Sequence, residues 1–130
     1  MSGLAYVDAS ALAKLVVDEP GSESMARWYV EAERVNTSVI GVIETRRAVT
    51  RREHDAAHLE AVMRSVIVIA LDRSIARTAA TVGPPALRSL DAIHLATALA
   101  LGDELDAFVT YDDRLADAAR ALGLPVVRPT

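Results

Sequence analysis

The segment LAYVDASALAKLVVDEPG, residues 4–21, contains in order a strand, a polar turn and a helix. Residues 4–7 are continuously apolar and predict a buried strand that ends at Asp8. Residues 10–17 have the apolar spacing of a helix, which the DEPG sequence then ends. A strand without polar alternation is typical of a parallel sheet with both faces covered. The segment therefore predicts the first strand–helix unit of an α/β fold.

The same alternation of strands and helices continues along the rest of the chain. Further short strands are predicted at residues 35–38, 66–71, 106–110 and 126–127. Helical spacing predicts helices at residues 22–33, 42–53, 54–64, 72–82, 87–101 and 114–122. Because no linker or internal repeat interrupts this pattern, we expect one domain over residues 1–130, with a central parallel β-sheet flanked by α-helices on both faces.

The composition is that of a globular protein from a reducing compartment. Of the 130 residues, 52% are hydrophobic and 25% are charged, which separates the chain from disordered proteins. Cysteine is absent, and this excludes disulfides, thiolate zinc sites and cysteine nucleophiles. No apolar run approaches the roughly 18 residues of a membrane helix, and the first residues do not resemble a signal peptide. We therefore expect a cytoplasmic protein that does not enter a membrane.

The distribution of charge matters more than its total. A net charge of −4 argues, taken alone, against nucleic-acid binding. However, 13 of the 14 basic residues are Arg, and four of these lie in one predicted helix: Arg46, Arg47, Arg51 and Arg52. Arg47 and Arg51 share one side of that helix and are candidates to contact an RNA backbone. The alternative is that the cluster is a solvated helix face.

Four carboxylates lie where parallel strands end or helices begin. Asp8 and Asp112 each follow a predicted strand, and Glu44 and Asp91 are expected in the first turns of helices. Because ligands bind outside the carboxyl ends of parallel strands, we expect all four to meet at that edge. Each also has a structural explanation, as a helix N-cap or as an acid near the positive end of a helix dipole. Asp72, which also follows a strand, is interpreted only as a cap.

The chemistry of this set favours a hard cation. Asp91 begins an almost wholly apolar helix, where a carboxylate is poorly solvated unless a cation compensates it. Oxygen ligands without cysteine or clustered histidine suit Mg²⁺, with Mn²⁺ as a plausible substitute. Such ions activate water and neutralise charge on a phosphate. Ser10 and Thr110 are possible accessory residues that orient carboxylates or waters, although both are also explained as capping residues.

The segments YVDASALAKL, VIETRRA, LDAIHLATAL and FVTYDDRL resemble the four signature blocks of PIN domains, especially those of VapC-type toxin ribonucleases. The blocks occur in the family order and extend over residues 4–127. The resemblance implies a metal-binding and catalytic set of Asp8, Glu44, Asp91 and Asp112. It also implies a Mg²⁺-dependent RNA endonuclease that is the toxin of a type II toxin–antitoxin system. Its expected partners are an RNA substrate, a VapB-type antitoxin in a hetero-oligomer, and a second copy in a homodimer.

The fourth block departs from the family pattern because Asp113 stands next to Asp112. The pattern favours Asp112, two residues after Thr110, as the fourth acidic ligand. Asp113 then either assists the pocket or caps the last helix.

Other residues with possible functions have simpler explanations. His54 and His58 have the spacing of a zinc pair, but no third ligand is near them in the sequence. His94 lies on the same helix face as Asp91 and is interpreted as a hydrogen-bonded core histidine, although contact with the pocket remains open. Trp28 and Tyr29 are expected in core packing or in a groove for a partner helix, in preference to base stacking.

The alternatives to a nuclease are another α/β protein that binds or transfers phosphate and a non-catalytic interaction module. A phosphatase of the haloacid dehalogenase type requires a second Asp at the position of Ser10, and a phospho-receiver domain requires a late lysine, whereas Lys14 is the one lysine of the chain. Both are therefore disfavoured, as is dinucleotide binding, because no glycine-rich turn follows the first strand. A non-catalytic interaction module with a relic acidic pocket remains an alternative that a nuclease assay separates.

Overall fold

The computed structural model describes residues 3–130, in which a wholly parallel sheet lies at the centre of the molecule. Its five strands are arranged in the order β3-β2-β1-β4-β5. Their bounds are Leu4–Val7 (β1), Arg34–Ser38 (β2), Ile67–Ile69 (β3), Leu105–Val109 (β4) and Val126–Val127 (β5). The central strand β1 pairs directly with β4, which places the strand that ends at Asp8 beside the strand that precedes Asp112.

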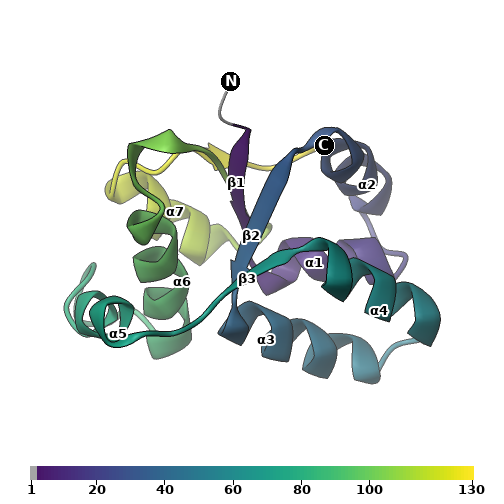
Figure 1. Cartoon of the computed structure of the whole chain (residues 1–130), viewed down its shortest axis with the longest axis horizontal. Helices are drawn as coiled ribbons and strands as arrows, with labels where there is room; N and C mark the ends of the chain where they lie inside the picture. The colour runs from purple at the N-terminus through teal and green to yellow at the C-terminus, as the bar shows by residue number, and fades with distance from the viewer. Residues whose placement is uncertain (1–2) are drawn as a thin grey trace.

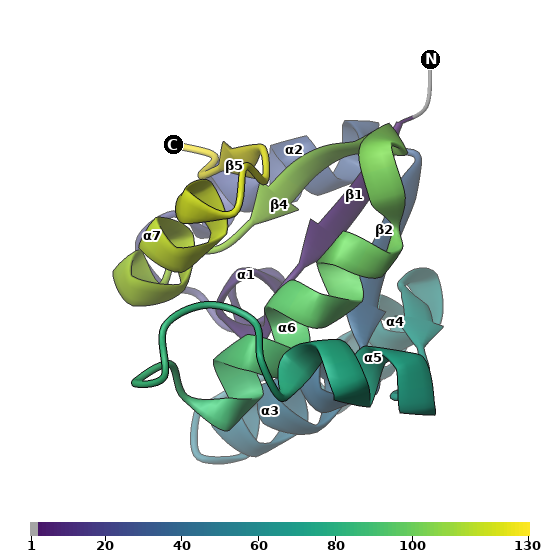
Figure 2. The same ribbon diagram turned by 90° about the vertical axis from the view of Figure 1, so that its left-hand side faces the viewer.

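Helices cover both faces of this sheet. Figures 1 and 2 show α1, α2 and α4 on one side and α5, α6 and α7 on the other, with α3 beneath the carboxyl ends of the strands. The helix bounds are Ala9–Val16 (α1), Ser22–Glu31 (α2), Val39–Thr50 (α3), Ala56–Ser65 (α4), Arg73–Ala79 (α5), Ser89–Ala100 (α6) and Asp113–Ala121 (α7). The predicted α/β class, with a parallel sheet between two helical layers, is confirmed.

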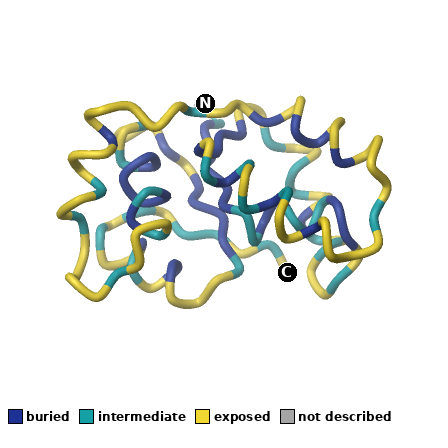
Figure 3. Tube along the Cα trace, turned by 90° about the horizontal axis from the view of Figure 1, so that it is seen from below, coloured by how far each residue is buried: buried dark blue, intermediate teal, exposed yellow. Residues whose placement is uncertain are grey.

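Two hydrophobic cores lie on the two faces of the sheet. Alternate residues of a strand point to opposite faces, and β1 accordingly sends Ala5 and Val7 into the core formed with α1, α2, α3 and α4. Leu4 and Tyr6 enter the other core, which β4, α6 and α7 complete. In Figure 3 the buried stretches run through the centre of the trace, while the connecting loops are exposed. The continuous apolar sequence of β1 is therefore explained by burial on both sides.

The edge strand β3 differs from its prediction. A buried strand was expected over residues 66–71, but only Ile67–Ile69 pair, and they pair with β2 alone. The side chains of Ile67 and Val68 remain 48% and 45% exposed. An apolar run by itself does not distinguish a central strand from an edge strand, because the two differ only in what packs against them.

Several helix ends also differ from the predicted ends, and one of these changes concerns the site. Helix α3 begins at Val39, three residues earlier than predicted, because the Ser38 hydroxyl accepts hydrogen bonds from the backbone N–H groups of Ile40 and Gly41. Glu44 consequently lies in the second turn of α3 and not in the first. Among the helices of residues 3–130, none is long and apolar enough to cross a membrane.

Candidate active site

Asp8 is a buried carboxylate held by three hydrogen-bond donors. It lies directly after β1 and is only 4% exposed. Its Oδ1 accepts from Ser10 Oγ at 2.7 Å and from the backbone N–H of Ala11 at 3.0 Å, while Oδ2 accepts from Thr110 Oγ1 at 2.6 Å. Burial raises the pKa of this carboxyl group, and the two hydroxyl donors act in the opposite direction. Asp8 is thus both the N-cap of α1 and a carboxylate whose charge is incompletely compensated.

Ser10 and Thr110 connect Asp8 to the loop that follows β4. Ser10 Oγ accepts from the backbone N–H of Tyr111 at 2.8 Å, and Thr110 Oγ1 accepts from that of Asp112 at 3.1 Å. Each hydroxyl therefore donates to Asp8 and accepts from this loop. Both hydroxyls bond to a carboxylate, as one of the predicted roles requires, and Thr110 also shows the other, because it caps its own turn through the N–H of Asp112.

Asp91 lies at the same edge, in the first turn of α6 as predicted. Partial burial raises the pKa of its carboxyl group, and repulsion from the nearby carboxylates of Asp112 and Glu44 raises it further. Positive charge at His94 or Arg88 has the opposite effect. Three of the four predicted acids therefore interact electrostatically, although they are separated by up to 68 positions in the sequence, from Glu44 to Asp112.

Of the two roles considered for Asp113, assisting the pocket or capping the last helix, the capping role is wrong. Asp112 is the N-cap of α7, because its Oδ1 accepts from the backbone N–H groups of Arg114 and Leu115 at 2.9 and 3.2 Å. Asp113 is the first residue of the helix and pairs with Arg128 at 2.7 Å. Asp112 is also the member of the doublet that repels Asp91. A capping role and a place at the acidic edge are therefore compatible in one residue, as they are in Asp8.

Glu44 contacts a histidine instead of another carboxylate. Its Oε1 lies 2.6 Å from Nε2 of His94, and Nδ1 of the same ring lies 2.6 Å from the hydroxyl of Tyr6. His94 is 2% exposed, so it is the predicted core histidine and also touches the site. Sequence reasoning missed Tyr6 altogether. The position of His94, three residues after Asp91, was the one local signal of this contact.

The donor chemistry of this edge fits a divalent hard cation. The four acids provide only oxygen atoms, and Asp8 and Asp91 both have raised pKa values that a neighbouring cation would lower. Within the described chain, no three His, Asp or Glu side chains already form a ligand cluster. Oδ1 of Asp8 and of Asp112 bonds to helix N–H groups, and Oε1 of Glu44 bonds to His94. The second oxygen of Asp8 accepts from Thr110 Oγ1, whereas the second oxygens of Asp112 and Glu44 have no hydrogen bond within residues 3–130.

The arginine-rich face of α3 divides into paired and unpaired residues. Arg46 forms a two-pronged ion pair with Glu60 of α4, at 2.6 and 3.0 Å, and Arg52 lies 4.0 Å from Glu19. Arg47 and Arg51 are exposed and line a hollow of about 260 Å³ together with Thr50. In residues 3–130 neither of these two has an ion-pair partner.

The other predicted candidates lie in structural contacts. His58 Nε2 bonds to the backbone carbonyl of Leu15 at 2.8 Å, and His54 Nδ1 to that of Arg52 at 2.9 Å, so the histidine pair does not form a zinc site. Trp28 and Tyr29 pack against the core beside α1, as preferred, and Tyr29 bonds to Ser65. Asp72 caps α5 through a 2.8 Å bond from Ile75 N, which confirms its interpretation as a cap.

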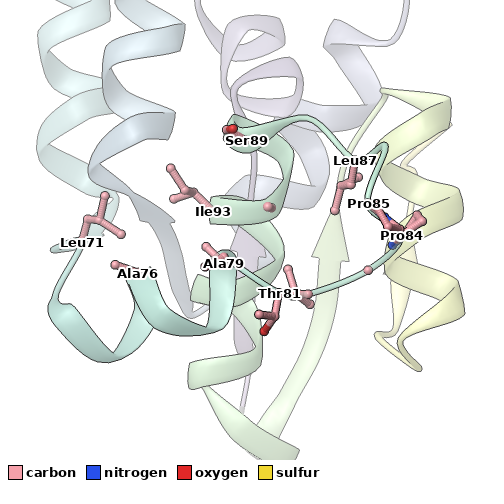
Figure 4. A pocket seen from close by; sticks show the side chains of 13 residues that line it. Leu71, Ala76, Ala79, Thr81, Pro84, Pro85, Leu87, Ser89 and Ile93 are labelled. Carbon is pink, nitrogen blue, oxygen red and sulfur yellow. The ribbon is translucent and has the colours of Figure 1, made fainter.

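A cavity beside α5 and α6 does not contain the acidic edge. It measures about 630 Å³ and lies between α5, the loop after it and the start of α6. Figure 4 shows Leu71, Ala79, Leu87 and Ile93 among the side chains around it. No charged residue lines this cavity. It offers no group for acid–base chemistry or for binding a metal, so the acidic edge remains the candidate active site.

Comparison with known proteins assigns the chain to one family. Residues 5–121 match the PIN domain family. Ribonuclease VapC35 of Mycobacterium tuberculosis is 40% identical over 129 residues, which cover 95% of this chain and 96% of that protein. The structure of M. tuberculosis VapC20, described as a toxin that cleaves the sarcin–ricin loop, aligns with a TM-score of 0.75 at 21% identity and covers 96% of this chain and 99% of that one. A toxin–antitoxin complex from Klebsiella pneumoniae aligns with a TM-score of 0.66 at 20% identity over 97% and 98% of the two chains. The chain therefore belongs to the PIN-domain family and, within it, to the VapC ribonucleases.

Proposed function

We propose that the protein is a Mg²⁺-dependent RNA endonuclease that acts in the cytoplasm as the toxin of a type II toxin–antitoxin system. In this proposal Asp8, Glu44, Asp91 and Asp112 form its metal-binding and catalytic set. Residues 1–130 act as one domain. Mn²⁺ is expected to replace Mg²⁺, since both bind oxygen ligands.

The observation that carries the proposal is the state of Asp8. Three donors bond to this carboxylate, yet burial still raises its pKa. Partial burial also raises the pKa of Asp91, and two of the other acids, Asp112 and Glu44, raise it further. A carboxylate that only caps a helix does not require other acids beside it. Asp72, which only caps α5, is accordingly exposed to solvent. A divalent ion at this edge supplies an activated water and neutralises charge on the scissile phosphate.

The residues around the acids have separate tasks. Ser10 and Thr110 hold Asp8 in one orientation and fix the loop that carries Asp112. Asp113 is excluded from the ligand set because it pairs with Arg128. Arg47 and Arg51 contact the RNA backbone, since they are exposed, unpaired and located on the helix that carries Glu44.

The test is cleavage of RNA by purified variants. Asp8→Asn and Asp91→Asn should abolish cleavage while the fold survives, because asparagine at position 8 keeps one side-chain oxygen to cap α1 and Asp91 caps no helix. EDTA should stop the wild type, and Mg²⁺ or Mn²⁺ should restore it. Asp72→Asn is the matched control, a capping aspartate outside the site, and should cleave normally. Full cleavage in EDTA would show that the acids are structural.

We further propose that the protein binds a VapB-type antitoxin in a hetero-oligomer and forms a homodimer. The relationship to VapC proteins and the toxin–antitoxin complex of the same fold support the first part. The exposed apolar side chains of Val39, Ile43 and Leu90, on α3 and at the start of α6, support the second. Light scattering should give twice the monomer mass for the wild type and a lower mass for Ile43→Asp. A wild-type monomer at every concentration would rule out the homodimer.

A further inference from the structure

Tyr6 and His94 form a buried chain of hydrogen bonds that ends on Glu44. Tyr6 lies in β1 and is fully buried, and its ring stacks on that of Phe108 with centroids 5.3 Å apart. Its hydroxyl oxygen is 2.6 Å from Nδ1 of His94, and Nε2 of the same ring is 2.6 Å from Oε1 of Glu44. The two bonds connect the centre of the sheet to a carboxylate at its edge.

The direction of these bonds follows from the carboxylate, which as an anion can only accept hydrogen bonds. In the 2.6 Å contact with Oε1 of Glu44, Nε2 of His94 is therefore the donor. A neutral imidazole that carries its proton on Nε2 accepts at Nδ1. The Tyr6 hydroxyl, 2.6 Å from Nδ1, then donates to His94.

The packing around His94 leaves its ring little freedom to turn. The ring is 2% exposed, and it meets Tyr6 edge-on at a centroid distance of 5.8 Å. On the other side lies Gly41 of α3, where an added methyl group would come within 3.5 Å of Cε1 of His94. Glu44 is about one turn further along the same helix and bonds to the ring, so α3 approaches the ring closely and is attached to it.

We propose that Tyr6 and His94 are positioning residues for Glu44, which hold one carboxylate oxygen through a hydrogen-bonded relay and leave the other free at the acidic edge. The inference rests on the proposed nuclease function, in which Glu44 is a ligand. The Glu44 side chain is 30% exposed and would otherwise sample several rotamers. A relay anchored in the sheet reduces this freedom before the cation arrives.

The test compares variants along the relay by two measurements, cation affinity and cleavage kinetics. Tyr6→Phe and His94→Leu should each weaken Mg²⁺ binding about 10- to 100-fold, as expected when the partner of a ligand is lost. The loss in cleavage should appear in kcat more than in KM. His94→Gln should recover part of both, because its amide nitrogen supplies a donor close to the position of Nε2.

Matched controls exist for both relay residues. Tyr29→Phe removes a hydroxyl that bonds to Ser65, and His58→Gln alters a ring that bonds to the backbone of Leu15. Both should match the wild type in cation affinity and cleavage. A loss in these controls equal to that in Tyr6→Phe and His94→Leu would show a general packing effect and would overturn the proposal.

A spectroscopic measurement on the wild type tests the relay directly, even if a relay variant does not fold. Nitrogen-15 shifts of the His94 ring, recorded on the metal-free wild type, should show the neutral tautomer with its proton on Nε2. A proton on Nδ1 alone would overturn the relay.

The variant Glu44→Gln distinguishes a failure of the relay from a failure of the proposed role of Glu44 as a ligand. If it abolishes cleavage while Tyr6→Phe and His94→Leu behave as wild type, the relay is wrong and the nuclease function stands. If it retains normal cation affinity and cleavage, Glu44 is not a cation ligand, so its place in the metal-binding set and the relay are both wrong.

Discussion

At the scale of single residues, Asp112 combines a structural and a chemical role that a substitution can separate. Asparagine caps helices about as well as aspartate, so Asp112→Asn should leave the free energy of unfolding nearly unchanged and remove RNA cleavage. Asp112→Ala should lose cleavage and also about 1 kcal/mol of stability, the usual effect of a lost cap. Urea unfolding and a cleavage assay on the two variants provide the comparison.

The neighbouring Asp113 is the internal control for this prediction. It is a mostly exposed partner of Arg128, so Asp113→Asn should keep full cleavage and lose at most about 1 kcal/mol. If Asp113→Asn were inactive and Asp112→Asn active, the fourth ligand would be Asp113.

The raised pKa values of Asp8 and Asp91 predict the pH dependence of stability. A carboxyl group whose pKa is higher in the folded than in the unfolded state favours folding in its protonated form. Its stabilising contribution is therefore present at low pH and is lost as pH rises through the raised pKa. In EDTA, lowering the pH from about 8 to about 5 should stabilise the wild type more than Asp91→Asn or Asp8→Asn. Unfolding midpoints across this range give the differences, with Asp72→Asn expected to follow the wild type.

At the scale of elements, α3 is the helix expected to meet the substrate. Arg47→Ala combined with Arg51→Ala should weaken binding to all RNA sequences. It should also reduce the slope of the logarithm of the binding constant against the logarithm of the salt concentration by up to about two, because each phosphate contact releases counterions. Arg27→Ala combined with Arg120→Ala removes the same charge from two other helices and serves as the control. Binding would be titrated at several salt concentrations with a metal-free inactive variant. An equal loss in both double variants would indicate a general effect of net charge.

The packing of α3 against β2 depends on the absence of a side chain at Gly41. An added methyl group would overlap Oγ1 of Thr37, which donates to the backbone carbonyl of Val7 at 2.7 Å. Alanine normally stabilises a helix relative to glycine by about 1 kcal/mol, but Gly41→Ala should destabilise this protein. In a Thr37→Ala background the effect should be smaller, because the overlapping atom is gone. Additive losses in the double-mutant cycle would contradict this explanation.

At the scale of the whole molecule, cation binding should be linked to folding. The proposed site exists only in the folded chain, so Mg²⁺ at 100 times its dissociation constant should stabilise the fold by about 2.7 kcal/mol. This corresponds to a rise of several degrees in the melting midpoint. Asp91→Asn should be at least as stable as the wild type in EDTA, because one repelling charge is removed, and it should respond little to Mg²⁺. Thermal melting at constant ionic strength measures both, and identical responses would mean that the acids share no cation.

The sequence by itself determined the order of strands and helices, the parallel sheet and the candidate acids. These features depend on local properties. Apolar runs indicate strands, spacing indicates helices, and a capping residue bonds within its own turn. Asp72 shows this well, since its bond to Ile75 spans three residues. The first strand was predicted to the residue, because its neighbours Gly3 and Asp8 are both poor strand formers.

Only the tertiary structure decided how the acids are held. The bonds from Thr110 to Asp8 and from His94 to Glu44 join residues 102 and 50 positions apart. Both depend on the strand order, which places β4 beside β1 and α6 against β2. The ion pair of Arg128 with Asp113 likewise requires the last strand to return beside β4. Such contacts leave no periodic signal in the sequence, because the distance between their residues is set by the packing of the whole sheet and not by the geometry of a single element.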